Sequence, residues 1–421
     1  MIKMATLRLP QDQPSKFNME DKTESGIFSA PTIASLHEIL PAEPLLMMGA
    51  GPVPIPEAVA NANRNVINHL GSTMSRIIGQ VKEMSQYVFQ TRSPWILGVA
   101  GPGSAAMEMA ISNLVTRNTR VLCVCNGYFS QRMAEMCQRL GAEIEILQCP
   151  EKSQVDLERF IEAVDNFEPD CITIVQGETS NTTFNQQLPQ LGVEARKRGC
   201  ITIVDAVCTL STTPLQMDDW QIDAVITGGQ KGLSSIPGVS LVAFSEKAWE
   251  RIQNRTWTPA HWCLDARLAE NFWHKGSYHY TAPVSGVLAL HEALRLICLE
   301  GLQARFLRHE RCSRALQNGV QAMGLSLFVP EQSRLNSVIG IEAPERISNR
   351  EICTYMSEKY QVEISGSFGL PIVRIGQMGE QCRAQNLFRT LHALGCTMRD
   401  LGVTVDIPRG MGELESSLIG H

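Results

Sequence analysis

Short apolar runs alternate with longer amphipathic segments along most of this 421-residue chain. A run of about five apolar residues is typical of a buried strand, and the segments between the runs are long enough for helices. The runs lie at residues 96–100, 120–125, 143–147, 171–176, 201–204, 224–227 and 240–244. Strands joined through helices form βαβ units, so the pattern predicts an α/β protein with a mostly parallel, seven-stranded sheet.

The pattern changes near residue 300. A long amphipathic helix there ends at Gly324, and short apolar runs follow at 325–329, 337–341, 362–364 and 373–375. Four regions are therefore predicted. They are an N-terminal arm at 1–43, a large domain at 44–299, a smaller α+β domain at 300–405 and a tail at 406–421. The arm is rich in Pro, Ser and Thr and contains one short helix near 32–40. The tail contains Gly and Ser and is expected to be loose.

Composition excludes several classes of protein. A hydrophobic content of 44% with 19% charged residues is typical of a globular protein with a large core. The net charge of -6, without a long basic run, argues against nucleic acid or an anionic membrane as a partner. No secretory signal is visible, and no segment approaches the roughly 18 apolar residues of a membrane span.

The cysteines and histidines suggest neither disulfides nor a metal site. The thirteen cysteines are scattered and include no C-x-x-C pair, which is typical of reduced thiols in a cytoplasmic protein. His274 and His279 lack carboxylate or thiol partners at ligand spacing, so we expect them to be structural.

Lys231 stands among small residues directly after an apolar strand. Gly228, Gly229 and Gly232 flank it, and residues 232–238 carry no charge. An amine in a tight, partly desolvated pocket loses its proton readily and can form an imine with a carbonyl group. The alternative is an exposed lysine in a turn.

Asp205 favours the first interpretation. It ends the apolar strand at 201–204, and open α/β sheets bind ligands at the carboxyl ends of their strands. A lysine for an imine and an aspartate for a pyridinium nitrogen are the two protein groups that a pyridoxal phosphate site requires.

The glycine-containing loop at 101–106 follows a strand and precedes a helix, which favours binding of an anion. It also fits the dinucleotide fingerprint, so a nicotinamide-dependent oxidoreductase is a rival function. That fingerprint requires an acidic residue at the end of the next strand, where this chain has Cys125-Asn126-Gly127. The oxidoreductase is therefore disfavoured, and a structural glycine turn is the third alternative.

Six motifs of this chain resemble, in order, those of the fold-type I, class V pyridoxal phosphate aminotransferases, in particular the alanine/serine–glyoxylate aminotransferase group. They are NGYF at 126–129, QGETS at 176–180, VDAV at 204–207, GQKG at 229–232, YHYT at 278–281 and VRIG at 373–376. The resemblance covers about residues 45 to 400. It implies transamination between a small amino acid of the alanine or serine type and a 2-oxo acid, with glyoxylate or pyruvate as the acceptor.

The resemblance also implies a role for each matched residue. Lys231 forms the imine and moves the proton, while Asp205 holds the pyridine nitrogen. The other implied cofactor contacts are Gly103, Ser104 and Gln230 on the phosphate, Phe129 and Val207 on the two ring faces, and Thr179 near the phenolic oxygen. Arg374 is expected to bind the substrate carboxylate with its planar fork. Gly51 and Thr209 are expected to face the substrate.

Tyr278 and Thr281 match positions that reach the cofactor phosphate of a neighbouring subunit, which implies a homodimer with shared active sites. Two further alternatives keep the cofactor. A pyridoxal phosphate lyase or decarboxylase would break a different bond. A pyridoxamine–pyruvate aminotransferase is disfavoured by the retained Gln230, Tyr278 and Thr281, because its substrate carries no phosphate.

Overall fold

The computed structural model describes residues 30–31 and 33–419. Contacts separate the chain up to Leu45 from a second compact unit that begins at Leu46. In the first unit the described residues form helix α1 (Leu36–Ile39), where Glu38 accepts hydrogen bonds from the backbone N and the Oγ of Ser35. Most of the predicted arm, residues 1–29 and 32, lies outside the described residues.

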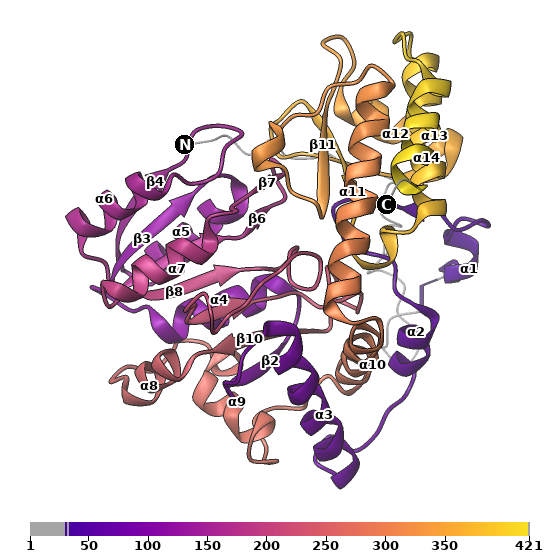
Figure 1. Ribbon diagram of the computed structural model, residues 1–421. Helices are drawn as coiled ribbons and strands as arrows, with labels where there is room; N and C mark the ends of the chain where they lie inside the picture. Colours follow the sequence, from indigo (N-terminus) through magenta and orange to yellow (C-terminus); the bar gives the residue numbers. More distant parts are fainter. Residues whose placement is uncertain (1–29, 32, 420–421) are drawn as a thin grey trace. The chain divides into compact units, whose positions relative to one another are not determined.

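A seven-stranded sheet lies at the centre of the second unit (Figure 1). Within it β10 alone runs antiparallel to its neighbours, so the predicted mostly parallel α/β sheet is confirmed. In spatial order the strands are β2 (Ile96–Ala100), β10 (Val239–Phe244), β9 (Ala224–Ile226), β8 (Ile201–Asp205), β5 (Cys171–Val175), β3 (Arg120–Cys125) and β4 (Glu143–Gln148).

Helices connect these strands and pack on the sheet. Helix α4, for example, contacts β2, β9 and β10, and α5 contacts β3. The helices of this part are α2 (Glu57–Asn63), α3 (Ser72–Phe89), α4 (Gly103–Leu114), α5 (Tyr128–Arg139), α6 (Leu157–Phe167), α7 (Leu188–Lys197), α8 (Glu246–Asn254), η1 (Trp262–Leu264), α9 (Ala266–Trp273) and α10 (Val284–Glu300). A short hairpin, β6 (Gly177–Glu178) with β7 (Thr183–Phe184), follows β5.

The C-terminal part contains a three-stranded antiparallel sheet with β14 between β11 and β13, and β1 pairs with β12 separately. Its elements are β1 (Leu46–Met47), α11 (Leu302–Ala322), η2 (Glu331–Ser333), β11 (Val338–Glu342), α12 (Asn349–Tyr360), β12 (Val362–Glu363), β13 (Ser365–Gly366), β14 (Ile372–Gly376), η3 (Gly379–Gln381), α13 (Ala384–Asp400) and α14 (Ile407–Ile419).

Separate buried clusters underlie the two sheets. One surrounds the seven-stranded sheet, and another joins α11, α13 and α14 to the three-stranded sheet through residues such as Leu316, Ile375 and Leu391. The predicted boundary near residue 300 stays a prediction, because the contacts group the chain from Leu46 onward as one unit.

Two local predictions differ from the structure. Residues 325–329 form no strand, because only Leu327 bridges to Ile341 before Pro330 and the η2 turn redirect the chain. The predicted loose tail is helix α14. It packs tightly on α11, since a Cβ added to Gly410 would lie 2.9 Å from the carbonyl oxygen of Gly319, and Leu414 is fully buried. The Gly- and Ser-containing composition of this segment indicated a loose tail, whereas close packing at glycine positions stabilises a helix.

None of the helices in the described part of the chain is long and apolar enough to span a membrane.

Candidate active site

Asp205 and Lys231 lie at the same edge of the central sheet. Asp205 is the last residue of β8 and pairs with Ile226, the last residue of β9. Lys231 follows β9 after a short loop at 227–230. Because β8 and β9 are parallel neighbours, both functional groups emerge at the carboxyl edge, where α/β sheets bind ligands.

The Lys231 amine is held in a narrow space. Its Nζ donates a hydrogen bond to the carbonyl oxygen of Ala50. A Cβ added to Gly51, whose φ is +97°, would lie 2.5 Å from Nζ, so glycine leaves the room that the amine needs. Burial lowers the pKa of Lys231 to about 8, which makes the neutral, nucleophilic amine accessible near neutral pH.

The Asp205 carboxyl group is buried without a cationic partner in the described part of the chain. It is 5% exposed, and its Oδ1 accepts a hydrogen bond of 2.8 Å from the backbone N of Val207. The buried aspartates that form ion pairs among the described residues are Asp223 and Asp265. Burial raises the pKa of Asp205 to about 7, because the hydrogen bond from Val207 and the charges of Arg132 and Lys231 offset only part of the lost hydration of the carboxylate.

The first turn of α4 lies beside Val207, two residues after Asp205. A Cβ added to Gly103 would lie 2.8 Å from Cγ2 of Val207 and 3.5 Å from Cα of Gly228, so backbone N–H groups approach the site closely. The Oε1 of Gln230 is buried without a hydrogen-bond partner among the described residues. Ser104 accepts a hydrogen bond of 2.9 Å from Nη1 of Arg132. The Arg132 guanidinium and the free backbone N–H groups at the N-terminus of α4 favour an anion.

Aromatic side chains form one wall of the site. Phe129 and Tyr128 begin α5, and the Phe368 ring stacks on Tyr128 with centroids 4.5 Å apart. Phe368 meets Phe129 edge to face at 6.1 Å. The guanidinium of Arg132 lies 4.8 Å from the centroid of Phe129, a cation–π distance.

Glu178 binds the backbone at the start of α5, which carries these aromatic side chains. Its side chain is fully buried, and Oε2 accepts hydrogen bonds of 3.0 Å from the backbone N of both Phe129 and Ser130. Oε1 accepts from the backbone N and Oγ of Ser180. The carboxyl group therefore caps α5 and fixes the backbone that carries Phe129, although burial raises the pKa of Glu178.

Arg374 lies on β14 and is 6% exposed. Its Nε donates to the carbonyl oxygen of Gly366 and its Nη1 to that of Thr179, both at 2.7 Å. Burial lowers the pKa of Arg374 to about 10, and its charge also helps to lower the pKa of Lys231. Thr179 thus contacts Arg374 through its backbone.

Three other expected residues lie in contrasting surroundings. Thr209 is fully buried, and its Oγ1 has no hydrogen-bond partner in the described part of the chain. Tyr278 and Thr281 lie on the exposed segment between α9 and α10, with Tyr278 58% exposed. No hydrogen bond of the described residues links either of them to Asp205 or Lys231.

No group of three or more His, Cys, Asp or Glu side chains is placed to hold a metal within residues 30–31 and 33–419. His274 instead accepts a hydrogen bond of 2.8 Å from Nζ of Lys82, and Nε2 of His279 donates to the carbonyl oxygen of Trp262 at 2.9 Å.

Comparison with known proteins decides the family. The sequence model described as "Aminotransferase class-V" matches residues 56–389, which is most of the chain. The chain belongs to the class V aminotransferases.

Individual relatives agree with this assignment. The alanine–glyoxylate aminotransferase of Drosophila melanogaster is 32% identical over 374 residues, which cover 86% of this chain and 95% of that one. The structure of a ureidoglycine–glyoxylate aminotransferase from Bacillus subtilis matches with a TM-score of 0.87 at 28% identity, covering 90% of this chain and 99% of that one. An alanine–glyoxylate aminotransferase structure from Nostoc sp. matches with a TM-score of 0.82 at 30% identity, covering 87% and 100%.

Class V aminotransferases use pyridoxal phosphate, and the site of this aminotransferase fits that group. The unpaired, buried carboxyl group of Asp205 suits a protonated ring nitrogen, which would supply the missing countercharge. The close approach of Gly103 to Gly228 leaves backbone N–H groups for a phosphate, and the Arg132 guanidinium on Ser104 adds a cation at the start of the same helix. Lys231 has the displaced pKa that imine formation needs.

Sequence reasoning missed Glu178 and Arg132. Both lie in or next to quoted motifs, but a glutamate in a polar loop and an arginine on an amphipathic helix usually face solvent. The weak signal was that Glu178 sits between two strand-like segments at the end of β5, where burial is common.

Proposed function

We propose that this aminotransferase moves an amino group from a small amino acid of the alanine or serine type to a 2-oxo acid, with glyoxylate as the preferred acceptor and pyruvate as the second. The relatives named above act on glyoxylate according to their names. The observation that carries the proposal is a neutralisable amine and an unpaired buried carboxyl group at one sheet edge, with the buried Arg374 of β14 near enough for its charge to lower the pKa of the amine.

Pyridoxal phosphate, when bound, supplies an aldehyde that condenses with amines and a ring that withdraws electrons released at the substrate α-carbon. Lys231 would hold the cofactor through its amine, and the same amine would move the α-proton of the substrate. Asp205 keeps a proton on the ring nitrogen by direct charge interaction.

The other side chains bind and orient. Arg374 holds the α-carboxylate of the amino or oxo acid, with Gly51 and Thr209 beside it. Gly103, Ser104 and Gln230 bind the phosphate. Phe129 and Val207 enclose the two ring faces, and Thr179 lies toward the phenolic oxygen. A carboxylate fixed by Arg374 leaves the Cα–H bond as the one exposed to Lys231, which favours deprotonation over loss of CO₂.

The direct test is a matrix of amino donors and 2-oxo acceptors with the cofactor-loaded protein. Alanine and serine with glyoxylate should release pyruvate or hydroxypyruvate together with an equal amount of glycine. Without an acceptor, product should stop at about one equivalent per site, because the amino group stays on the cofactor. Continued product release without an acceptor would identify a lyase or decarboxylase instead.

We also propose a homodimer in which Tyr278 and Thr281 reach the partner's cofactor phosphate. The exposure of Tyr278 in the single chain supports this, because a phenol placed for a partner site has little cover of its own. Mixing Lys231→Ala subunits with Tyr278→Ala subunits tests it. If the sites are shared, one of the two sites in a mixed dimer combines an intact Lys231 with an intact Tyr278 from the other subunit. The activity of the mixture should then exceed the summed activities of the two variants measured separately. Simple additivity would contradict the shared site.

The thirteen free cysteines support a reducing compartment, and we propose the cytoplasm. Fractionation of cells that express the tagged full chain tests this placement.

A further inference from the structure

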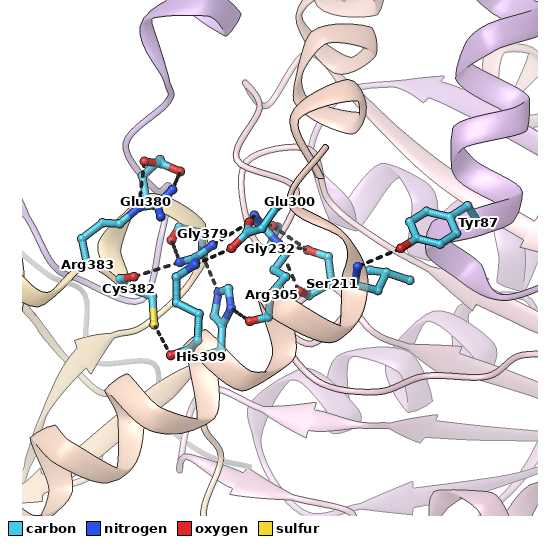
Figure 2. Close-up of polar contacts among 12 residues, drawn as sticks. Tyr87, Ser211, Gly232, Glu300, Arg305, His309, Gly379, Glu380, Cys382 and Arg383 are labelled. Carbon is cyan, nitrogen blue, oxygen red and sulfur yellow. Dashed lines mark hydrogen bonds and ion pairs between the residues drawn. The ribbon is translucent and has the colours of Figure 1, made fainter. Parts of the chain in front are cut away.

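Two arginines of α11 share one carboxylate but bind different parts of the chain. Glu300 lies 2.8 Å from Nη1 of Arg305 and 2.5 Å from Nε of Arg308. The rest of the Arg305 fork turns toward the loop of Lys231, as Figure 2 shows for Ser211 and Gly232. Arg308 instead donates to the carbonyl oxygens of Gly379 and Cys382, at 2.9 and 2.8 Å.

Arg305 holds the residue that follows the lysine. Its side chain is buried, with the residue 3% exposed. Nη2 donates to the carbonyl oxygen of Gly232 at 2.7 Å, and Nε donates to that of Ser211 at 3.1 Å. Ser211 Oγ also donates to Gly232 O at 2.8 Å. The guanidinium therefore links the segment after Asp205 to the segment after Lys231.

The backbone around Gly232 has no room to relax. A Cβ added to Gly232 would collide with the carbonyl oxygen of Leu210, so the two segments are in direct contact. Ser234 N donates to the carbonyl oxygen of Lys231 at 2.9 Å, which closes the loop on its other side. A change at the Gly232 carbonyl must therefore move the Lys231 backbone, because close-packed segments do not absorb such a shift locally.

His309 fixes the turn of α11 from which Arg305 projects. Its Nδ1 donates to the carbonyl oxygen of Arg305 at 2.7 Å, and its Nε2 accepts from the backbone N of Gly379 at 3.0 Å (Figure 2). The imidazole is therefore neutral, with the proton on Nδ1. Gly379 follows β14, the strand that carries Arg374. The same helical turn thus contacts both the lysine loop and the segment beyond the arginine strand.

We propose that Arg305 is a positioning residue for Lys231: its hydrogen bond to the Gly232 carbonyl sets the place of the catalytic amine relative to Asp205 and Arg374. The chemical roles of those three residues rest on the proposed function, whereas the geometry of the contact does not. A buried guanidinium that satisfies two backbone carbonyls and a carboxylate is rigid, and such rigidity suits a reaction in which a small displacement of the base lowers the rate strongly.

Arg308 supplies a matched control. It lies on the same helix, pairs with the same Glu300 and holds two backbone carbonyls, but none of them belongs to the lysine loop. The Arg308→Met change leaves the His309–Gly379 hydrogen bond in place, so the helical turn stays attached. Each arginine holds Glu300 and two backbone carbonyls. Arg305→Met and Arg308→Met should therefore lower the unfolding temperature by similar amounts.

The first measurement is the pKa of the Lys231 amine in the full chain without cofactor. Competitive acylation of Lys231, measured by peptide mass at several pH values, gives its pKa. Arg305→Met should shift this pKa by at least ~0.5 pH unit relative to the wild type, because the depth of the amine in its pocket changes. Arg308→Met should leave it unchanged. This measurement needs no cofactor and no turnover.

The loaded enzyme gives the second readout. Arg305→Met should lower kcat roughly 10- to 100-fold, as expected for a displaced base, with the KM of the amino acid within about 3-fold. Arg308→Met should keep kcat within about 3-fold. Arg305→Lys keeps the charge without the fork, so it should recover part of the loss and serves as the test variant if the methionine variant does not fold.

Equal shifts in the two methionine variants, in acylation and in kcat, would overturn the proposal and leave Arg305 as a structural residue. An unchanged Lys231 pKa in Arg305→Met would overturn it as well. A wild type that acylates as expected but shows no transamination would contradict the proposed function only.

Discussion

Two groups of buried and partly buried charged side chains in this aminotransferase are built in opposite ways. They are the strand-edge cluster (Asp205, Lys231 and Arg374) and the helix cluster (Glu300, Arg305 and Arg308). In the helix cluster the carboxylate of Glu300 is paired with both arginines. In the strand-edge cluster the hydrogen bonds go to backbone groups, namely the carbonyls of Ala50, Gly366 and Thr179 and the N–H of Val207.

The pKa values differ in the same sense. Burial raises the pKa of Asp205 to about 7, lowers that of Lys231 to about 8 and lowers that of Arg374 to about 10, so all three move toward the neutral form. For Glu300, burial is outweighed by the two arginines, and its pKa falls to about 2, toward the charged form.

The difference separates structure from function. A buried charge without a countercharge destabilises the fold, so it persists where a ligand supplies the partner. Under the proposed function, a ring cation would be such a partner for Asp205 and a substrate carboxylate for Arg374. The helix cluster needs no ligand, because Glu300 pairs with both arginines and backbone carbonyls accept hydrogen bonds from their other N–H groups.

Removal of the amine should break the strand-edge cluster most severely. Lys231→Ala should fold, but borohydride should no longer attach the cofactor to the protein, and multiple turnover should be lost because attachment and proton transfer use the same amine. Peptide mapping after reduction checks this. Cofactor found on another lysine in the wild type would contradict the assignment.

The change Asp205→Asn should affect rate and stability in opposite directions. Turnover should fall at least ~10²-fold, since about 3 kcal/mol of transition-state stabilisation is lost. The pKa of Asp205 lies about three pH units above that of a free aspartate, so its ionised form costs the cofactor-free fold up to about 4 kcal/mol.

The destabilisation of the cofactor-free fold by ionised Asp205 depends on pH. A raised pKa means that the destabilisation is absent below pH ~4 and is complete above pH ~7, so the cofactor-free variant should be more stable than the wild type at pH 8 and equal at pH 4. Pyridoxal phosphate should reduce or reverse the difference at pH 8. Denaturant unfolding with and without cofactor measures both. A variant that is never more stable than the wild type would show that Asp205 is paired within the protein.

Arg374→Lys tests the substrate side of the strand-edge cluster. Lysine keeps the charge but cannot bind the carboxylate at two points. The lost hydrogen bonding is worth roughly 1.5–3 kcal/mol, so kcat/KM for amino and oxo acids should fall about 10- to 150-fold. The spectrum of the bound cofactor should not change. A simple amine without a carboxylate is the control substrate and should be nearly indifferent. Equal losses for the amine and the amino acid would make Arg374 structural.

Glu300→Gln should have the smallest effect on turnover and a clear effect on stability. The lowered pKa of Glu300 means that its stabilisation is present above pH ~4.5 and is lost as the pH falls through about 2. At pH 7 the variant should lose up to about 3 kcal/mol of unfolding free energy. Denaturant unfolding at pH 7 and pH 3 checks the size and the pH dependence. A larger loss in turnover than in Arg305→Met would show that the carboxylate, rather than Arg305, orders the lysine loop.

The amino-acid sequence by itself determined the sheet and the two residues that end or follow its strands. The runs at 201–204 and 224–227 are too apolar and too short for anything but buried strands, so Asp205 and Lys231 had to lie at strand ends. Lys231 among glycines was recognisable because a solvated lysine does not need them. The family and the enzyme class follow from these motifs, and the comparisons confirm both. The roles of all the site residues, Lys231 and Asp205 included, stay predictions.

The tertiary structure alone decided which charges are paired. Arg305 and Arg308 stand three residues apart on one helix and look equivalent in the sequence, yet one contacts the lysine loop and the other the segment after β14. Glu178 and Arg132 likewise gained their contacts from elements distant in the chain. Local patterns encode burial through periodicity, but the partner of a buried charge depends on which segments meet, and strand order and helix packing settle that only when the chain folds.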